Sequence, residues 1–350
     1  MDLIDKNQTS AVPLPVIYGG YATSGGTVIR HFLDEFSNSV NFKPEFRILR
    51  ERFGLIELHH SIFNSRSPEN IDLAIKDFLW LVENFARELK RFGKNGGDYD
   101  KYTHGQFSIA AREFINEITD FTYPMDWFFY DFKKSRLKSV FDRKMTQLGS
   151  KRPSDLAYLC TPEENFFFLC SQKFIARCVS AISWKKGDDP KEFVGLHNAV
   201  PPYDSELAEL SKNLIGPCKI IFVDRDPRDI YLSLPTSADG RYLKPNSDPE
   251  ERAKLFVKFY KFLRRNTGTL KTVDNLKQVK FEDLVLDYSA QAKSISKFIG
   301  LDNTKHVEQF KFFDPEKSRT GIGKWRLVVG AEIKAISIIE KALEDDLYQL

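Results

Sequence analysis

A chain of 350 residues that is 42% hydrophobic and 29% charged can bury a substantial core, and its length suits one α/β domain with a large insertion. Its formal net charge of +3 is too small for a protein that binds nucleic acid along a basic face, although it allows a local basic pocket for a phosphorylated ligand. No run of about 18 apolar residues, no signal-peptide pattern and no disulfide-like cysteine spacing occur, so we expect a reduced, cytoplasmic protein without a membrane span.

The first predicted elements are a strand and a helix joined by a glycine-rich loop. Val16, Ile17 and Tyr18 form a β-branched and aromatic run, and helical spacing begins at Val28. Backbone N–H groups at such a strand-to-helix turn bind anions, although a tight structural turn explains the glycines equally well. Because Gly26 occupies the lysine position of a Walker A motif, a nucleoside triphosphatase is disfavoured. The candidate anion-binding residues are Tyr21, Ala22, Thr23, Ser24, Gly25, Gly26 and Thr27.

A second strand is predicted over residues 46–49, and a long helical segment follows. From Ser67 to about Ser183 apolar residues recur at helical intervals, with Ser67 placed as an N-cap and Pro68 in the first turn. We therefore expect a large helical insertion over residues 65–190, acting as an acceptor-binding cap. Its many aromatic residues form either a platform for a sugar or planar molecule or the ordinary core of a helical cap.

The remaining elements alternate between strands and helices. Strands are predicted over residues 193–196, 219–223 and 279–281, and helices over residues 204–214, 290–299 and 331–347, with another helix beginning near Asp229. Strands separated by helices form a parallel sheet with crossover connections. The expected fold is a single α/β domain over residues 1–350, with a parallel sheet flanked by helices and the large helical insertion.

Arg225 and Ser233 form a second candidate for anion binding. They flank Pro227, which suits the first turn of a helix, so both side chains can face one phosphate. Arginine offers a planar fork of donors, and serine adds a hydroxyl. The alternative is that Arg225 and Arg228 pair with the neighbouring aspartates at the rim of the helix.

Four segments resemble the sulfotransferases that use 3′-phosphoadenosine 5′-phosphosulfate (PAPS). The segment KIIFVDRDPRDIYLS over residues 219–233 resembles the family's 3′-phosphate-binding segment, with the arginine and serine at the family's spacing. The proline-containing turn at 200–203 and the helix after it are similar to the segment preceding that strand. Residues 279–301 resemble the family's strand followed by Glu-Asp-Leu and a helix, and residues 317–326 resemble its C-terminal basic loop.

The resemblance implies a P-loop-like nucleotide site and transfer of sulfonate from PAPS to a hydroxyl or amine of a carbohydrate or small molecule, without a metal. It implies that the glycine-rich loop holds the 5′-phosphosulfate and that Arg225 and Ser233 hold the 3′-phosphate. The further cofactor-binding residues that it implies are Phe281, Lys317, Arg319, Gly321 and Lys324.

Two departures from the family's pattern affect this assignment. Many members carry a lysine or arginine before the serine of the glycine-rich loop, where this chain has Thr23. We expect Lys324, Arg326, Arg50 or Arg52 to supply the missing charge. The C-terminal loop also has one residue fewer between its glycines than is typical.

The general base for the acceptor proton is expected near the end of the second strand. Glu51 is our first candidate because it follows the predicted strand, although it also fits a surface glutamate paired with Arg50 or Arg52. His59 and His60 are the alternatives because histidine titrates near neutral pH. Adjacent histidines on a helix point in different directions, so we expect no metal site there.

Two other functions remain open on the sequence. One is a catalytically inactive nucleotide-binding protein, which the threonine at position 23 motivates. The other is a P-loop kinase-like phosphotransferase with a degenerate loop, which would need a Walker lysine and a magnesium-binding acid. The acceptor's identity and the oligomeric state are not determined by the residues alone.

Overall fold

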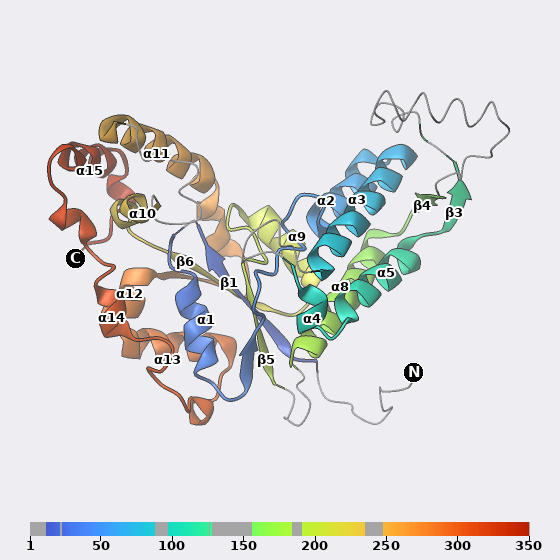
Figure 1. Cartoon of the computed structure of the whole chain (residues 1–350), viewed down its shortest axis with the longest axis horizontal. Coiled ribbons are helices and arrows are strands. Elements are labelled where there is room, and N and C mark those ends of the chain that lie inside the picture. The colour runs from blue at the N-terminus through green and yellow to red at the C-terminus, as the bar shows by residue number, and fades with distance from the viewer. Residues whose placement is uncertain are drawn as a thin grey trace.

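The computed structural model describes residues 12–21, 23–87, 97–125, 127, 156–183, 191–234 and 248–349. A parallel sheet with the strand order β2-β5-β1-β6-β7 lies at its centre (Figure 1). Its strands are β1 (Leu14–Gly20), β2 (Ser39–Asn41), β5 (Phe193–His197), β6 (Lys219–Asp224) and β7 (Leu276–Lys280). Every neighbouring pair is parallel. The predicted α/β class with a parallel sheet flanked by helices is therefore confirmed.

Helices surround this sheet and build the insertion (Figure 1). They are α1 (Thr27–Asp34), α2 (Leu55–His60), α3 (Pro68–Ala86), α4 (Tyr99–Tyr102), α5 (Gln106–Ile118), α8 (Glu164–Ser183), α9 (Ser205–Ile215), α10 (Pro227–Ser233), α11 (Pro249–Arg264), α12 (Phe281–Leu286), α13 (Tyr288–Ile299), α14 (Pro315–Arg319) and α15 (Ala331–Ala342). A π-helical turn covers Ser61–Ser65, and 3-10 turns cover Thr267–Thr272, Asn303–Lys305, Lys324–Leu327 and Glu344–Asp346.

The prediction of a strand over residues 46–49 is wrong. The edge strand β2 is only three residues long and precedes this segment, and residues 46–49 run into a turn. The carbonyl oxygens of Ile48 and Leu49 accept hydrogen bonds from the N–H groups of Leu55 and Ile56 rather than from a neighbouring strand. A run of four residues that is mostly apolar shows that a segment is buried, but does not distinguish a strand from a buried turn.

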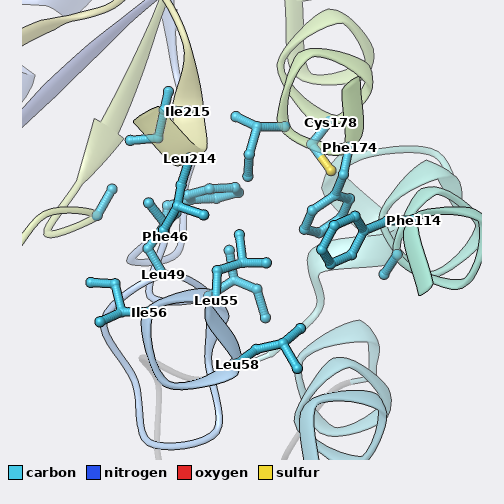
Figure 2. Close-up of a cluster of buried hydrophobic side chains, with 14 of the residues drawn as sticks. Phe46, Leu49, Leu55, Ile56, Leu58, Phe114, Phe174, Cys178, Leu214 and Ile215 are labelled. Carbon is cyan, nitrogen blue, oxygen red and sulfur yellow. The ribbon is translucent and has the colours of Figure 1, made fainter. Parts of the chain in front are cut away.

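The insertion packs on the sheet through one continuous core. Figure 2 shows Phe46, Leu49, Leu55, Ile56 and Leu58 meeting Phe114 of α5, Phe174 and Cys178 of α8, and Leu214 and Ile215 of α9. The described part of the insertion is mainly helical, as expected. It also contains an antiparallel hairpin of β3 (Phe121–Pro124) and β4 (Leu156–Leu159), which was not predicted.

Helix α8 is long and apolar enough to cross a membrane, judged by length and composition alone. Half of its most apolar 18-residue window is buried inside the protein. The buried side chains include Phe167, Phe174 and Cys178, which belong to the core between insertion and sheet. A core helix passes the same test, so α8 is weak evidence for a membrane span.

The two faces of the sheet bury different cores. Ile17 of β1 joins the core shared with the insertion, whereas its neighbours Val16 and Tyr18 point into a second core with α1, α12 and α13. A third core joins α10, α11 and α15 through residues such as Phe256 and Ile339. These three cores place the loops that follow β1 and β6 between the insertion and the C-terminal helices.

Candidate functional site

Two loops leave the carboxyl edge of the sheet side by side. β1 and β6 are neighbours, but the chain continues from β1 through α1 to β2 on one side, and from β6 through α10 and α11 to β7 on the other. The loop of residues 20–27 and the loop of residues 224–227 therefore diverge at a topological switch point. Open parallel sheets bind their ligands at such points.

Glycines let the 20–27 loop approach its neighbours closely. A Cβ atom on Gly20 would lie 2.2 Å from the carbonyl oxygen of Val223. Gly25 has a φ of +93°, and a Cβ there would lie 2.6 Å from the ring of Phe281. Packing alone thus accounts for these two glycines, and an anion site needs separate evidence.

Ser24 gives such evidence. Its side chain is 1% exposed, and its hydroxyl has no hydrogen-bond partner among the described residues. The loop leads directly into α1, whose N-cap Gly26 supplies no side-chain cap. A buried hydroxyl without a partner costs free energy that a bound acceptor would recover. The loop and the first turn of α1 therefore form a cradle suited to an anion.

Arg225 joins this cradle to two distant segments. Its Nη1 donates to the carbonyl oxygen of Thr23 at 3.3 Å and to the hydroxyl of Ser233 at 3.5 Å, and its Nη2 donates to the carbonyl oxygen of Gly321. The guanidinium lies 4.9 Å from the centre of the Phe281 ring. Its Nε is buried without a hydrogen-bond partner in the described parts of the chain. Four residues that were expected to bind nucleotide therefore lie beside the 20–27 loop: Arg225, Ser233, Gly321 and Phe281.

The electrostatic surroundings leave Arg225 available to an anion. Burial lowers its pKa, and the nearby carboxyl groups of Asp229 and Glu282 act in the opposite direction. Burial also raises the pKa of Asp229, and it raises the pKa of Glu282 to about 7. No ion pair joins Arg225 to a described carboxylate, so the alternative of a structural ion pair holds only for Arg228, which contacts Asp226 at 2.6 Å.

Asp229 fixes the C-terminal loop against this site. Its side chain is fully buried and accepts hydrogen bonds from the backbone N–H groups of Gly323 at 2.8 Å and Lys324 at 2.9 Å. These bonds hold the loop where the carbonyl oxygen of Gly321 meets Arg225. Asp229 was not among the expected site residues, because its role depends on a loop some ninety positions later in the chain.

The basic side chains of the C-terminal loop point elsewhere. Lys317 forms an exposed ion pair with Asp314 at 3.3 Å, and Arg319 forms one with Glu316 at 3.5 Å. The side chain of Lys324 is exposed, and only its backbone contacts the site. The structure thus brings Gly321 to the site but does not bring these three cations to it.

A cavity of about 1020 Å³ opens over the 20–27 loop. Its polar lining residues come from the loop, from the segment after β2 and from the end of β5 and the segment after it, and its apolar lining residues come from the end of α10 and from α11. The lining residues are Gly20, Tyr21, Thr23, Ser24, Gly25, Gly26, Thr27, Glu45, Arg47, Arg50, His197, Asn198, Tyr203, Leu234, Leu255, Phe259 and Leu263. Ala22 lies outside the described residues.

His197 and Glu45 are the groups with acid or base chemistry on the polar side. Nδ1 of His197 lies 3.8 Å from Oε1 of Glu45, and Asn198 donates to that same oxygen at 3.0 Å. The imidazole stacks on Tyr18 with ring centres 5.3 Å apart. Burial lowers the pKa of His197, and Glu45 opposes this shift. The imidazole is therefore neutral at pH 7 and able to accept a proton.

The three residues proposed as the general base do not line this cavity. Glu51 forms an ion pair with Arg47 at 2.7 Å. His59 is buried in the insertion side of the molecule, where its Nε2 lies 2.8 Å from Oε1 of Glu164. His60 is exposed. The expectation for Glu51 relied on a strand over residues 46–49, and in the turn found there Arg47 and Arg50 line the cavity whereas Glu51 does not.

Sequence reasoning missed His197 and Glu45, although one signal for His197 was present. His197 directly follows the predicted strand 193–196, and side chains at the carboxyl ends of parallel strands commonly face ligands. Glu45 had no such signal because β2 is too short to be recognised. Arg50 was considered only as one of several cations, and the apolar residues of α11 were not connected with the site at all.

The insertion contributes no described residue of the range 65–190 to the cavity lining. Tyr99 is buried in the core, and Trp80 is 55% exposed and packs edge-on against Phe53 at 6.0 Å. Trp80 and Tyr99 therefore form no platform at the site, and the aromatic residues at 128–130 lie outside the described residues. The role of the insertion as an acceptor-binding cap stays a prediction.

Metal ligands do not gather in the part of the chain that the structure describes. No group of three or more His, Cys, Asp or Glu side chains there is arranged to hold a metal ion. The four cysteines, at positions 160, 170, 178 and 218, are all buried and free. The expectation of metal-independent chemistry stays a prediction.

Comparisons with known proteins give distant similarities only. No protein-family model and no curated protein matches the sequence. Among solved structures, the chain is similar to the sulfotransferase domain of the olefin synthase from Synechococcus PCC 7002, at 15% identity and a TM-score of 0.44, with 98% of each chain covered. It is also similar to sulfotransferase STF9 from Mycobacterium avium, at 12% identity and a TM-score of 0.40, covering 96% of this chain and 76% of that one. A sulfotransferase from Alicyclobacillus acidocaldarius follows at 11% identity and a TM-score of 0.38, covering 97% and 98%. Similarities this distant carry no weight for function.

Proposed function

We propose that the chain is a sulfotransferase that moves a sulfonate group from PAPS to a hydroxyl or amine of a small-molecule or carbohydrate acceptor. The observation that carries this proposal is the meeting of Arg225, Ser233, Phe281 and Gly321 beside the 20–27 loop. These residues come from three segments whose sequences resemble the nucleotide site of PAPS-dependent enzymes. Their convergence at a switch point is the arrangement that such a site requires.

The residues present fit the nucleotide. The unpartnered hydroxyl of Ser24 and the backbone N–H groups of its loop suit the 5′-phosphosulfate, and the unpartnered Nε of Arg225 suits the 3′-phosphate together with Ser233. The Nη groups of Arg225 now bind neutral oxygens, and a phosphate is a stronger, charge-assisted acceptor that competes with them. Phe281, Lys317, Arg319 and Lys324 remain proposed contributors because they lie beside or on the loop that meets Arg225.

The transfer requires a nucleophile on the acceptor, a base that takes the nucleophile's proton, and positive charge that compensates the negative charge on the bridging oxygen. The acceptor oxygen or nitrogen bonds to sulfur while the bond between sulfur and the bridging phosphate oxygen breaks, and that oxygen keeps the electron pair. The acceptor's proton passes to a base. No electrons are exchanged with a redox partner, so positioning and electrostatic stabilisation supply most of the catalysis.

His197 is the base that the geometry favours. It lines the same cavity as the 20–27 loop, it is neutral at pH 7, and Glu45 lies 3.8 Å from its Nδ1, where a carboxylate stabilises the imidazolium that forms. Glu51, His59 and His60 remain candidates only if the chain rearranges, because none lines the cavity.

The acceptor side of the cavity has an apolar wall. Leu255, Phe259 and Leu263 are spaced four residues apart on α11, so they form one stripe, and Leu234 lies at the end of α10. Leu255 is 52% exposed and Phe259 is 44% exposed. This wall suits an acceptor with an apolar body and a single hydroxyl or amine directed toward His197.

The test of the nucleotide assignment uses two ligands. Arg225→Gln should weaken binding of 3′-phosphoadenosine 5′-phosphate (PAP) by about 10- to 100-fold, because a charge-assisted contact is lost. Binding of adenosine 5′-phosphate, which lacks the 3′-phosphate, should change little. Isothermal titration calorimetry with both ligands measures the difference, and Ser233→Ala gives a milder version in the same direction. Equal losses for both ligands would show that Arg225 does not recognise the 3′-phosphate.

Activity assays distinguish a sulfotransferase from a kinase-like enzyme and from a catalytically inactive nucleotide-binding protein. Incubation with sulfur-35 PAPS and a panel of phenols, alkyl alcohols, amines and sugars should label at least one acceptor. Transfer of phosphate from γ-labelled ATP would instead indicate a kinase-like enzyme. Tight binding of PAPS without transfer to any acceptor would indicate a catalytically inactive nucleotide-binding protein.

A further inference from the structure

The 20–27 loop contains no basic residue. On the proposed function, this loop receives a sulfonate and a phosphate, and negative charge on the bridging oxygen grows as the sulfur–oxygen bond breaks. An anion in a partly buried site needs a compensating cation, and preorganised charge is the main source of catalysis in such transfers. Arg225 already meets this loop at the carbonyl oxygen of Thr23, but it is assigned to the 3′-phosphate. A second cation must therefore reach the sulfonate from another element.

The cations nearest to the cavity are mostly held by carboxylates. Arg47 lines the cavity, but it is paired with Glu45 at 3.4 Å and with Glu51 at 2.7 Å. Arg264 is paired with Asp224 at 2.8 Å, and it does not line the cavity. Neither guanidinium reaches a new anion without breaking an ion pair.

The remaining candidates from the sequence lie away from the cavity. Arg52 is exposed, and its guanidinium packs over the ring of Phe53 at 4.9 Å. Arg326 is exposed and packs over Trp325 at 4.9 Å, and Lys324 is exposed as well. None of the three is among the residues that line the cavity.

Arg50 differs from all of these. It lines the cavity together with the 20–27 loop, and no ion pair joins it to a described carboxylate. Its Nη2 contacts the hydroxyl of Tyr203 at 3.4 Å. The ring of Tyr203 lies 6.5 Å from that of Tyr21, a loop residue whose hydroxyl donates to the carbonyl oxygen of Pro202 at 2.5 Å. Arg50 is thus held beside the loop by a neutral partner.

We propose that Arg50 is the cation that pairs with the sulfonate group of the bound donor, a role that rests on the proposed function. Arg50 lines the same cavity as the 20–27 loop and His197, so its charge faces the space that the proposed donor and acceptor would share. Burial lowers the pKa of His197, Glu45 opposes this shift, and the charges of Arg30 and then Arg50 lower the pKa further, which helps to keep the base unprotonated. One side chain therefore serves both the donor and the proton transfer.

The test compares PAPS with PAP, which differ only in the sulfonate. In the absence of an acceptor, Arg50→Met should weaken PAPS binding by about 10- to 100-fold and leave PAP binding within about twofold of the wild type. Arg50→Lys keeps the charge and should retain most of the preference for PAPS. Arg52→Met is the matched control, because Arg52 is a neighbouring arginine outside the cavity, and it should bind both ligands like the wild type.

Several outcomes would overturn the inference. Equal losses for PAPS and PAP would mean that Arg50 contacts the nucleotide rather than the sulfonate. Unchanged PAPS binding together with a raised KM for the acceptor would mean that Arg50 binds an anionic acceptor. A lysine variant as weak as the methionine variant would exclude a role for the charge. Failure of the wild-type protein to bind either ligand would instead contradict the proposed function itself, and retained PAP binding by Arg50→Met shows that the variant is folded.

Discussion

His197 combines the two properties of a general base: access to the cavity and a neutral ring. His197→Asn should lower kcat by about 100-fold or more and leave PAP affinity nearly unchanged, because the residue acts on the acceptor proton. In the wild type, the pH–rate profile should fall on its acidic side at a pH below 6.5, the ordinary pKa of histidine, since burial lowers this pKa. Stopped initial-rate assays from pH 5 to pH 9 measure both effects.

His60→Asn is the control for that substitution, because His60 is exposed and lies outside the cavity lining. It should keep both the rate and the profile of the wild type. If His60→Asn or Glu51→Gln, rather than His197→Asn, removes the activity, the base has been assigned to the wrong residue.

Glu282 should make the stability of the protein depend on pH. Its side chain is 1% exposed, its Oε1 accepts a hydrogen bond from the backbone N–H of Asp226 at 2.9 Å, and burial raises its pKa to about 7. The folded state therefore keeps a proton that the unfolded state loses near pH 4.5. This contribution to stability is complete below pH 4.5 and is lost as the pH rises to about 7.

Glu282→Gln keeps the side-chain oxygen that accepts the hydrogen bond from Asp226 and removes the titratable carboxyl group. The variant should therefore be more stable than the wild type at pH 8, by up to about 3 kcal/mol, and the difference should shrink toward pH 5. Urea denaturation at several pH values measures it. A constant difference across this range would contradict the assignment of the shift to Glu282.

At the scale of elements, α11 presents two apolar stripes. Ala253, Phe256 and Tyr260 face the third core, and Leu255 and Phe259 face the cavity while remaining about half exposed. A soluble surface helix usually has only the first kind of stripe. The second stripe is explained if an apolar acceptor covers it during the reaction.

Phe259→Ala tests this role for α11. With an alkyl or aryl alcohol as acceptor, kcat/KM should fall by about tenfold because a buried aromatic contact is lost, and PAP affinity should not change. Phe262→Ala is the control, since Phe262 lies on the same helix, is 62% exposed and does not line the cavity. Equal effects of the two substitutions would contradict an acceptor site along α11.

At the scale of the whole molecule, the core shared by the sheet and the insertion predicts cooperative unfolding. Phe174 of α8 is 2% exposed and belongs to the same core as Ile17 of β1. Phe174→Ala should lower the free energy of unfolding by about 3–5 kcal/mol, and near-UV and far-UV circular dichroism should report a single transition. Phe121→Ala, on the exposed hairpin, should change stability by less than about 0.5 kcal/mol. Separate transitions for sheet and insertion would show that the two parts fold independently.

The sequence by itself determined the class of the fold and the location of the segments that we propose to bind nucleotide. Buried strands alternate with amphipathic helices, and this local pattern is sufficient to predict a parallel sheet. The 20–27 loop was predictable because glycines mark a tight strand-to-helix turn, and the segment around Arg225 was predictable because Pro227 marks a helix start and the surrounding sequence resembles that of PAPS-dependent sulfotransferases. These segments lie next to strands, so the chemistry of a few consecutive residues indicated their position.

Only the tertiary structure decided which side chains share the cavity. Glu51 was predicted to follow a strand, but residues 46–49 form a turn, Glu51 is paired with Arg47, and Glu45 lines the cavity instead. His197, Arg50 and Phe259 come from three elements that are far apart in the chain, and no local pattern connects them. Local preferences determine strands, helices and turns, whereas a catalytic site depends on the packing of distant elements, which the cores beneath the sheet and α11 establish.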